Sequence, residues 1–298
     1  MLEGRDHYEI PAFQRPYVWN EEEQWAPLWE DVRRVAEAQV GSDDDADAPE
    51  RRHFLGAVVT KALPSAAGGV TRHSVIDGQQ RMTTLQLLLD AAQAATEEHG
   101  HEEAEDLAVL VLNRSRRLAG MPERFKVWPS RTDRAAFEAA MDPVPSSASV
   151  DPESRPLKAH RYFRERVARW LVGDIDEALG DVVGSQDERA HALSAALQDR
   201  LGLVAITLDE SDDDQLIFET LNDRGTPLLS ADLVKNWVFQ WGHEAGADVE
   251  HWAESLWLEL DDDWWRDEVR QGRTSRARLD IFFQYWLTAR TREEVPTE

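Results

Sequence analysis

The chain has 298 residues, and its 58 acidic and 33 basic side chains give a formal net charge of −25. So acidic a protein repels DNA at long range unless basic residues gather locally. The absence of cysteine excludes disulfides, thiolate zinc sites and cysteine nucleophiles, and no apolar run is long enough to span a membrane, so we expect a cytoplasmic protein.

The order of the predicted elements indicates an α+β protein, with a small mixed β-sheet near the start and a mainly helical portion after it. The first half is predicted to hold an extended stretch at 8–11, a helix at 21–39 capped by Asn20, strands at 53–60 and 70–77, a helix from Gln79, helices at 103–112 and 131–141, and an extended piece at 125–128. The second half is predicted to hold helices at 157–172 and 188–197, a buried strand at 203–208, and helices to 290 that break at 225–227 and around Gly272. The Pro- and Ser-rich stretch 142–156 is the best linker candidate, so we expect a core at 1–141 and a mainly helical portion at 157–298. That portion is expected to return a strand and the FETLNDRG–DLVKN segment to the core.

The most informative motif is the predicted strand-to-helix junction VIDGQQRMTTL. A strand that turns into a helix through Gly78 presents backbone N–H groups at the positive end of the helix dipole, which favours anions. The Arg81 guanidinium suits phosphate oxygens, and the amides of Gln79 and Gln80 can donate or accept hydrogen bonds. This pattern predicts phosphate recognition. The alternative needs no ligand, because Asp77 and Gln80 have the spacing of a capping box.

A second motif, FQRPYVW, stands before the first predicted helix. Pro16 fixes its own φ and biases Arg15 to an extended conformation, so neighbouring side chains point in set directions. Gln14 and Arg15 could read a phosphate or a base edge, and the aromatic rings at 13 and 17 could wall a pocket. The alternative is an aromatic staple against the following helix, which we favour for Trp19.

In a third motif, FETLNDRGTPLLSADLVKN, polar side chains interrupt apolar surroundings at Asn222, Arg224, Lys235 and Asn236. Asp232 lies four residues before Asn236 and three before Lys235, so these side chains share one helical face. A polar set of this kind is typical of a ligand-pocket wall, and an ordinary surface ion pair is the alternative.

Together with HFLG at 53–56, these three motifs, in this order, resemble the N-terminal domain of GmrSD-type restriction proteins, which are ParB/sulfiredoxin-like proteins that act on modified DNA. The resemblance spans 13–236. It implies a ParB/sulfiredoxin-like core that binds and hydrolyses nucleoside triphosphates through 77–81 and thereby controls a separate C-terminal nuclease domain. The chain shows no His-rich nuclease motif, so we expect that domain or subunit outside it.

The resemblance also implies a DNA modification as the recognised feature. Some members recognise glucosylated hydroxymethylcytosine, and a related branch recognises phosphorothioate backbones. Because an aromatic-walled segment at 13–19 would suit a soft, less hydrated sulfur, phosphorothioate is the favoured modification and the glucosylated base is second.

The expected cofactor is Mg²⁺ with GTP or ATP, and Asp77 is the expected metal ligand. No Walker glycine loop is present, so an NTPase here is not of the P-loop kind. Arg81 and Lys235 are expected to clamp phosphates, whereas the acidic runs 209–214 and 261–263 read as helix-start and surface charge. The expected site residues are Asp77, Gln79, Gln80 and Arg81 for catalysis; Gly78, Thr83, Thr84, Asn222, Arg224, Asp232, Lys235 and Asn236 for nucleotide binding; and Phe13, Gln14, Arg15, Pro16 and Tyr17 for sensing modified DNA.

Three arginine-rich stretches, at 114–134, 155–169 and 266–278, could offset the net charge locally. If the first two converge, they make a groove that tracks DNA phosphates. The residues expected on the DNA backbone are Arg114, Arg117, Lys158, Arg161 and Arg164. The alternative, surface arginines paired with nearby acids, is the commoner role for any single residue.

Two functions of other classes stay open beside the NTP-hydrolysing sensor. One is a ParB-type DNA-binding module without NTP turnover, and the other is a toxin-like or regulatory NTP-using protein with a protein partner. Phosphate release that depends on magnesium separates the sensor from the first, and DNA stimulation of that release separates it from the second. The favoured function implies modified double-stranded DNA, a nucleoside triphosphate and a nuclease domain or subunit as partners, is compatible with a homo-oligomer, and involves no membrane.

Overall fold

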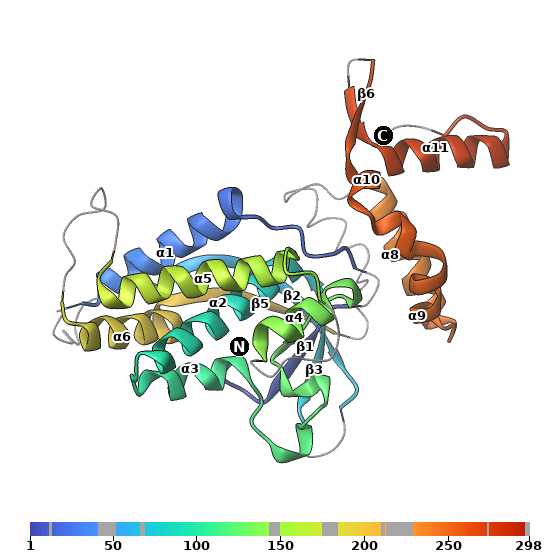
Figure 1. Ribbon diagram of the computed structural model, residues 1–298. Helices are drawn as coiled ribbons and strands as arrows, with labels where there is room; N and C mark the ends of the chain where they lie inside the picture. The colour runs from blue at the N-terminus through green and yellow to red at the C-terminus, as the bar shows by residue number, and fades with distance from the viewer. Residues whose placement is uncertain are drawn as a thin grey trace. The chain divides into compact units, whose positions relative to one another are not determined.

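The computed structural model describes residues 1–11, 14–40, 52–65, 69–142, 150–174, 184–209, 212, 229–272 and 274–295. The chain forms two compact units (Figure 1). The first unit contains Met1–Ile10 and Tyr17–Asp212, and the second contains Pro11–Pro16 and Asp213–Glu298. The division therefore falls after Asp212, whereas the expected linker at 142–156 lies inside the first unit and its last two residues already belong to a helix.

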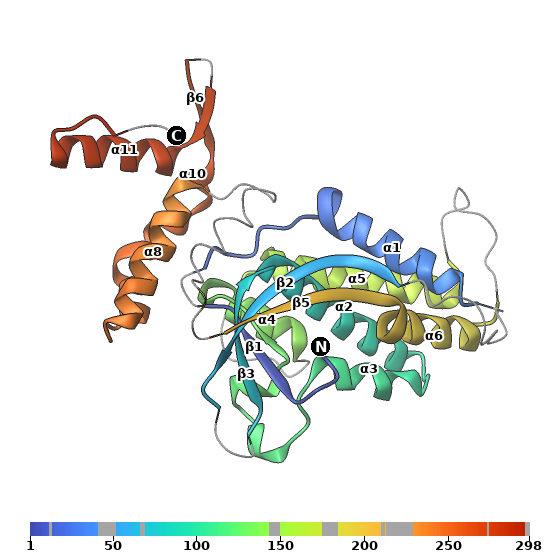
Figure 2. The same cartoon turned by 180° about the vertical axis from the view of Figure 1, so that it is seen from behind.

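The first unit is built on a five-stranded mixed sheet, as the sequence predicts, with strand order β4-β1-β3-β2-β5 (Figure 2). β1 runs parallel to β3 and β4, β2 runs antiparallel to β3, and β5 runs parallel to β2. The strands are β1 (Asp6–Glu9), β2 (His53–Leu63), β3 (Thr71–Asp77), β4 (Val127–Trp128) and β5 (Leu201–Leu208). The two predicted strands, β2 and β3, form an antiparallel pair, and the predicted return of a late strand to the sheet is confirmed.

The prediction that the last strand is buried is wrong. β5 lies at the edge of the sheet, and Val204 and Ile206 are exposed, as are the two residues at 205 and 207. An apolar, β-branched run specifies a strand, but the position of that strand in the sheet decides whether its side chains are covered.

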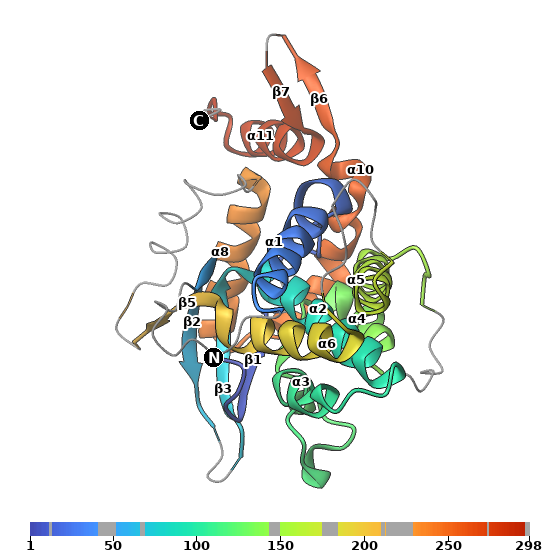
Figure 3. The same ribbon diagram turned by 90° about the vertical axis from the view of Figure 1, so that its left-hand side faces the viewer.

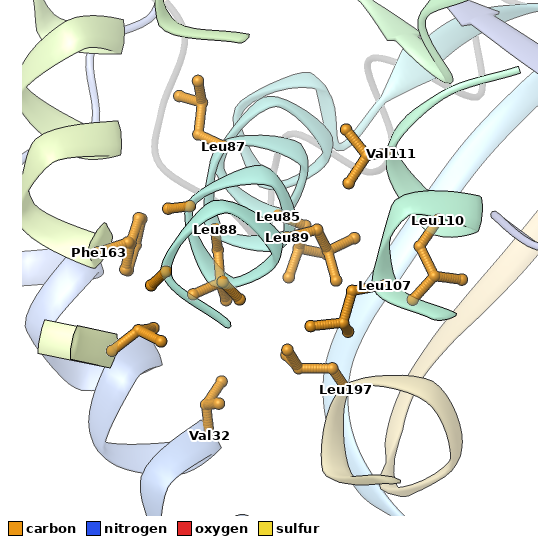
Figure 4. Close-up of a cluster of buried hydrophobic side chains, with 14 of the residues drawn as sticks. Val32, Leu85, Leu87, Leu88, Leu89, Leu107, Leu110, Val111, Phe163 and Leu197 are labelled. Carbon is orange, nitrogen blue, oxygen red and sulfur yellow. The ribbon is translucent and has the colours of Figure 1, made fainter. Parts of the chain in front are cut away.

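The helices of the first unit surround α2, which is buried along most of its length. Figure 3 shows α2, α3, α5 and α6 on the same side of the sheet. Figure 4 looks along α2 and shows Phe163 of α5 on one side of it and Leu107 and Leu110 of α3 on the other. The helices are α1 (Ala26–Glu37), which continues a π-helical segment (Glu21–Trp25), α2 (Gln79–Glu98), α3 (Glu103–Val111), α4 (Arg134–Met141), α5 (Arg155–Val172) and α6 (Gln186–Ala195).

The predicted Asn20 cap of the first helix is confirmed, and the helix buries one apolar face. The Asn20 side chain accepts a hydrogen bond from the Glu23 N–H at 3.0 Å, and Trp25, Trp29 and Val32 are buried on one helical face. At α5, Pro156 occupies the first helical turn, where its missing N–H has no intrahelical partner to lose. The linker prediction therefore extended two residues too far.

The second unit contains helices and one hairpin. Its elements are α8 (Ser230–Glu244), α9 (Val249–Trp252), α10 (Asp263–Arg266), β6 (Glu268–Gln271), β7 (Thr274–Ala277) and α11 (Arg278–Thr291). β6 and β7 pair in antiparallel fashion across a turn at Gly272, whose φ is +68°, so this region is not a helix with a break as predicted. Within the described residues, no helix of either unit is both long and apolar enough to cross a lipid bilayer.

Candidate functional site: the junction of β3 and α2

The predicted strand-to-helix junction exists. Asp77 ends β3, Gly78 adopts a left-handed conformation with φ +89°, and α2 starts at Gln79. No side chain caps α2, so the capping-box alternative for Asp77 and Gln80 is wrong. A Cβ at Gly78 would lie 3.1 Å from a methyl carbon of Val58, in addition to the strain of the positive φ. The junction therefore requires glycine, and within the part of the chain that the structure describes no side chain caps the first-turn N–H groups at the positive end of α2.

Arg81 is held against β2 by its guanidinium. Its Nη1 donates to the Ala57 carbonyl at 2.5 Å, and it lies so close to Gly56 that a Cβ there would be 2.6 Å from Arg81 Cζ. Gly56 has φ +113° and follows a β-bulge, so the strand is locally shaped to receive the guanidinium. Burial lowers the pKa of Arg81 and the charge of Asp77 opposes that shift. The glycine of the HFLG segment therefore leaves the space that the Arg81 guanidinium occupies against β2.

Gln80 connects the junction to the second motif. Its side-chain oxygen accepts the Val18 N–H at 2.8 Å, although the two residues are 62 positions apart. One turn further along α2, the Thr84 hydroxyl donates to the Gln80 carbonyl at 2.8 Å and lies 2.6 Å from the Tyr17 hydroxyl. The oxygen of Tyr17 also accepts the indole N–H of Trp25 at 2.8 Å. Two motifs that the sequence shows as separate thus form one hydrogen-bonded structure.

This arrangement changes the expected role of Tyr17. The ring is buried, and burial raises the pKa of its hydroxyl above the usual range. The backbone N–H of Tyr17 donates to Asp133 at 2.8 Å, and that carboxylate also accepts from the Ser130 hydroxyl at 2.7 Å. Tyr17 is therefore a support for α2 and not the exposed aromatic wall that we expected. The anchor at Asp133 was not found from the sequence, since its only signal was a polar residue near a helix start.

The remaining residues expected at the junction differ in accessibility. Asp77 and Gln79 are partly exposed, and among the described residues neither side chain has a hydrogen-bond partner. Thr83 is buried in α2, and Thr84 is occupied by Tyr17 and Gln80. Asp77, Gln79 and Arg81 are therefore the partly exposed polar side chains at the junction.

The fit of a magnesium ion depends on Asp77. Among the described residues, no group of three or more His, Cys, Asp or Glu side chains gathers in a way that could hold a metal. Mg²⁺ is commonly held by one or two carboxylates, with phosphate oxygens and waters completing its shell. A single partly exposed carboxylate fits an ion that arrives with a nucleotide, and it does not fit an all-protein cage.

Some predicted residues belong to the second unit or lie outside the described residues. Phe13, Asn222 and Arg224 lie outside them. The segment of Gln14, Arg15 and Pro16 clusters with the second unit, and Gln14 is buried there, with its N–H donating to the Pro11 carbonyl at 3.0 Å.

The polar face of α8 forms a buried ion network. Lys235 Nζ lies 2.7 Å from one carboxylate oxygen of Asp261 and 2.8 Å from the other, and Arg266 binds both oxygens of Asp232 at 3.0 and 3.1 Å. Burial lowers the pKa of Lys235, and the charge of Asp261 opposes that shift. Asp232 and Lys235 thus take partners from other elements instead of forming the surface pair we considered. The reading of Asp261 as surface charge is wrong, because its side chain is only 11% exposed.

Asn236, the remaining predicted residue on α8, is partly buried. Its side-chain oxygen is buried and has no hydrogen-bond partner among the described residues. For Lys235, binding a phosphate would require the ammonium to leave Asp261.

The arginine-rich stretches differ in how they are paired. On and before α5, Lys158 contacts Glu153 at 2.9 Å, Arg164 contacts Glu98 at 2.9 Å, and Arg161 donates to the Pro152 carbonyl at 2.6 Å. Arg161 also lies 3.9 Å from Glu153. The alternative of surface cations paired with nearby acids is therefore confirmed for Lys158, Arg161 and Arg164.

The stretch at 114–134 divides into paired and unpaired residues. Lys126 is buried and donates to the Gly4 carbonyl, and Arg124 contacts Asp142 at 2.7 Å. Arg114, Arg116 and Arg117 are exposed, and none of them has an acidic partner among the described residues. These three, which we call the Arg114–117 patch, are the remaining cationic surface of this stretch.

The comparisons with known proteins give one family. The sequence model described as "GmrSD restriction endonuclease, N-terminal domain" matches residues 1–239, which include the whole first unit and end within α8. A search of curated proteins finds no match to the chain. With the match covering most of the chain and both connected motifs, the chain belongs to the GmrSD restriction endonuclease N-terminal domain family.

Proposed function

We propose that this chain is the nucleotide-binding and nucleotide-hydrolysing sensor of a restriction protein that recognises modified DNA and controls a nuclease. Membership of the restriction endonuclease family supports the DNA-directed part. The observation that carries the nucleotide part is the junction of β3 and α2, where an uncapped helix start, Asp77 and a positioned Arg81 lie within five residues.

In this proposal the phosphates of GTP or ATP lie at the start of α2. The first-turn N–H groups bind phosphate oxygens, and Arg81 adds a fixed cation beside them. Asp77 holds the Mg²⁺ that neutralises phosphate charge when it is bound, and Gln79 is free to orient a water or a phosphate oxygen. Gln80 acts as a positioning residue, because its side-chain oxygen is engaged by Val18.

The DNA backbone would contact the Arg114–117 patch. Asn113 donates to the Asp6 carbonyl at 2.8 Å, at the start of β1, and Asp6 pairs in register with Thr71 at the start of β3. The junction lies at the other end of β3, six residues away in the strand, which is roughly 20 Å at 3.3 Å per residue. DNA phosphates and the nucleotide would therefore bind at separate places on the first unit.

The recognised modification is proposed to be a phosphorothioate or a glucosylated hydroxymethylcytosine. The argument for phosphorothioate used an aromatic wall, and Tyr17 is buried. Both modifications are therefore tested together. The assay is GTP and ATP hydrolysis with magnesium, alone and with plain, phosphorothioate or glucosylated duplex. We expect one modified duplex to stimulate phosphate release.

Two variants assign the roles. Asp77→Ala should abolish hydrolysis and leave duplex binding unchanged, with the exposed acid variant Asp106→Ala as the matched control. Arg116→Glu should weaken duplex binding and reduce its salt dependence, whereas Arg169→Glu, at a residue that contacts Asp174 at 3.0 Å, should change little. Unchanged hydrolysis by Asp77→Ala removes Asp77 from the mechanism. Duplex binding without hydrolysis by the wild type under any condition favours the ParB-type module.

A further inference from the structure

The segment 264–292 has a charge opposite to that of the whole protein. It contains seven arginines and three acidic residues, a net charge of +4 in a chain of net charge −25. The segment lies beyond the part matched by the family, which ends at residue 239. Local positive charge of this kind is what an acidic protein needs in order to approach a nucleic acid.

The elements of this segment form one surface. Figure 3 shows the β6–β7 hairpin projecting beside α11. Gln271 at the end of β6 donates to the Tyr285 hydroxyl at 2.8 Å, and Arg276 on β7 donates to Gln284 at 2.7 Å. The hairpin is thus fastened to α11, and Trp264 of α10 contacts Arg278 at the start of α11. We call the hairpin, α11 and Trp264 together the hairpin–α11 surface.

Two arginines of this surface have no acidic partner among the described residues. Arg270 on β6 and Arg290 near the end of α11 are both exposed, and neither has an acidic partner in the part of the chain that the structure describes. Arg270 reaches only the carbonyl of Gly272 in its own turn, at 3.3 Å. These guanidinium groups are available to an anion such as a phosphate.

The same surface exposes large aromatic rings. Trp264 is 54% exposed, Tyr285 is 59% exposed and Trp286 is 46% exposed. The Arg278 guanidinium carbon lies 4.5 Å from the centre of the Trp264 ring, and that of Arg290 lies 5.5 Å from the centre of the Trp286 ring. Exposed rings interleaved with guanidinium groups are the combination that binds single-stranded nucleic acid, because the rings stack on bases while the cations meet the backbone.

We propose that the hairpin–α11 surface binds a single, unpaired strand of nucleic acid. Bases stack on Trp264, Tyr285 and Trp286, and Arg270 and Arg290 contact the phosphates. A duplex suits this surface less, because its bases are already stacked on one another and are closed to the rings. The inference rests on the DNA-directed part of the proposed function, and it does not depend on the nucleotide site.

The test measures binding of a labelled oligo-dT and of the same length of duplex to the full chain, by fluorescence anisotropy without nucleotide. We expect oligo-dT to bind, and each of Tyr285→Ala and Trp286→Ala to weaken that binding by about tenfold, because a stacked base contributes roughly that factor. The matched control is Trp241→Ala, at an α8 ring that is 61% exposed and has no cation over it among the described residues. The charge variants Arg270→Glu and Arg290→Glu should weaken binding and reduce its salt dependence.

The outcomes separate this inference from the proposed function. Wild type that binds duplex but not oligo-dT overturns the strand-binding surface and leaves the sensor proposal standing. The inference also fails if Trp241→Ala loses as much affinity as Trp286→Ala, since the rings would then act only as a general apolar face, such as one for a protein partner. Both proposals are supported if only the hairpin–α11 variants lose affinity for oligo-dT and Arg116→Glu weakens binding of duplex alone.

Discussion

Replacing Gly56 with alanine should disconnect Arg81 from β2 and so test how the junction is built. The added Cβ would lie 2.6 Å from Arg81 Cζ and 2.8 Å from both Nε and Nη2, so the guanidinium has to move. Moving it breaks the 2.5 Å hydrogen bond from Nη1 to the Ala57 carbonyl. Alanine would also have to adopt the φ of +113° that glycine tolerates.

The two effects have separate magnitudes. The unfavourable φ costs about 1–3 kcal/mol of unfolding free energy. A hydrogen bond from a charged donor contributes about 1.5–3 kcal/mol, and partial exposure of Arg81 places its loss at the lower end. Gly100 supplies the control, because it has φ +81° and a Cβ there would meet no atom within 4 Å, so Gly100→Ala reports backbone strain alone.

Urea unfolding and nucleotide binding are the measurements. Gly56→Ala should lower the free energy of unfolding by roughly 1–2 kcal/mol more than Gly100→Ala does. Of the two variants, only Gly56→Ala should weaken nucleotide binding. In an Arg81→Ala background, Gly56→Ala should cost no more than Gly100→Ala, because the displaced group is absent. The reasoning is refuted if Gly56→Ala and Gly100→Ala behave alike with Arg81 present.

Two further predictions concern buried polar groups. Tyr17→Phe removes the acceptor of the Trp25 indole N–H and should destabilise the first unit by about 1–3 kcal/mol. Because burial raises the pKa of Tyr17 above its ordinary 10.0, the folded state keeps a proton that the unfolded state loses, so the stability it contributes is present below about pH 10 and falls above it. We expect the free energy of unfolding, measured with urea, to fall less between about pH 9 and pH 11 in Tyr17→Phe than in the wild type. An equal fall in the two proteins would contradict the assignment. Lys235→Met leaves Asp261 without its closest partner at 2.7 Å and should cost about 3–5 kcal/mol, whereas adding Asp261→Leu should recover much of that loss; additive costs in a double-mutant cycle would show that the two charges do not depend on each other.

Much of the local structure could be predicted because its causes are local. Asn20 caps the first helix, the β2–β3 hairpin forms where two β-branched runs flank a glycine-rich turn, and Gly78 ends β3 in the left-handed conformation that the junction needs. Each depends on residues only a few positions apart. Three of the failed inferences, the capping box, the buried strand and the surface acid at 261, used only neighbouring residues, whereas packing by distant segments decides each of them.

The sequence by itself determined the fold class, the order of the elements of the first unit and the position of the β3–α2 junction, because these depend on periodicity and turn residues. Only the tertiary structure decided which motifs meet. Gln80 reaches Val18, Arg81 reaches Ala57 beside Gly56, and Lys235 reaches Asp261 across distances in sequence that no periodicity encodes. The tertiary structure also decides which arginines remain unpaired, because an arginine is available to DNA only if the folded chain brings no carboxylate to it. Strand order and helix packing make that selection, and they leave Arg114, Arg116 and Arg117 unpaired among the described residues while Arg164 is paired with Glu98.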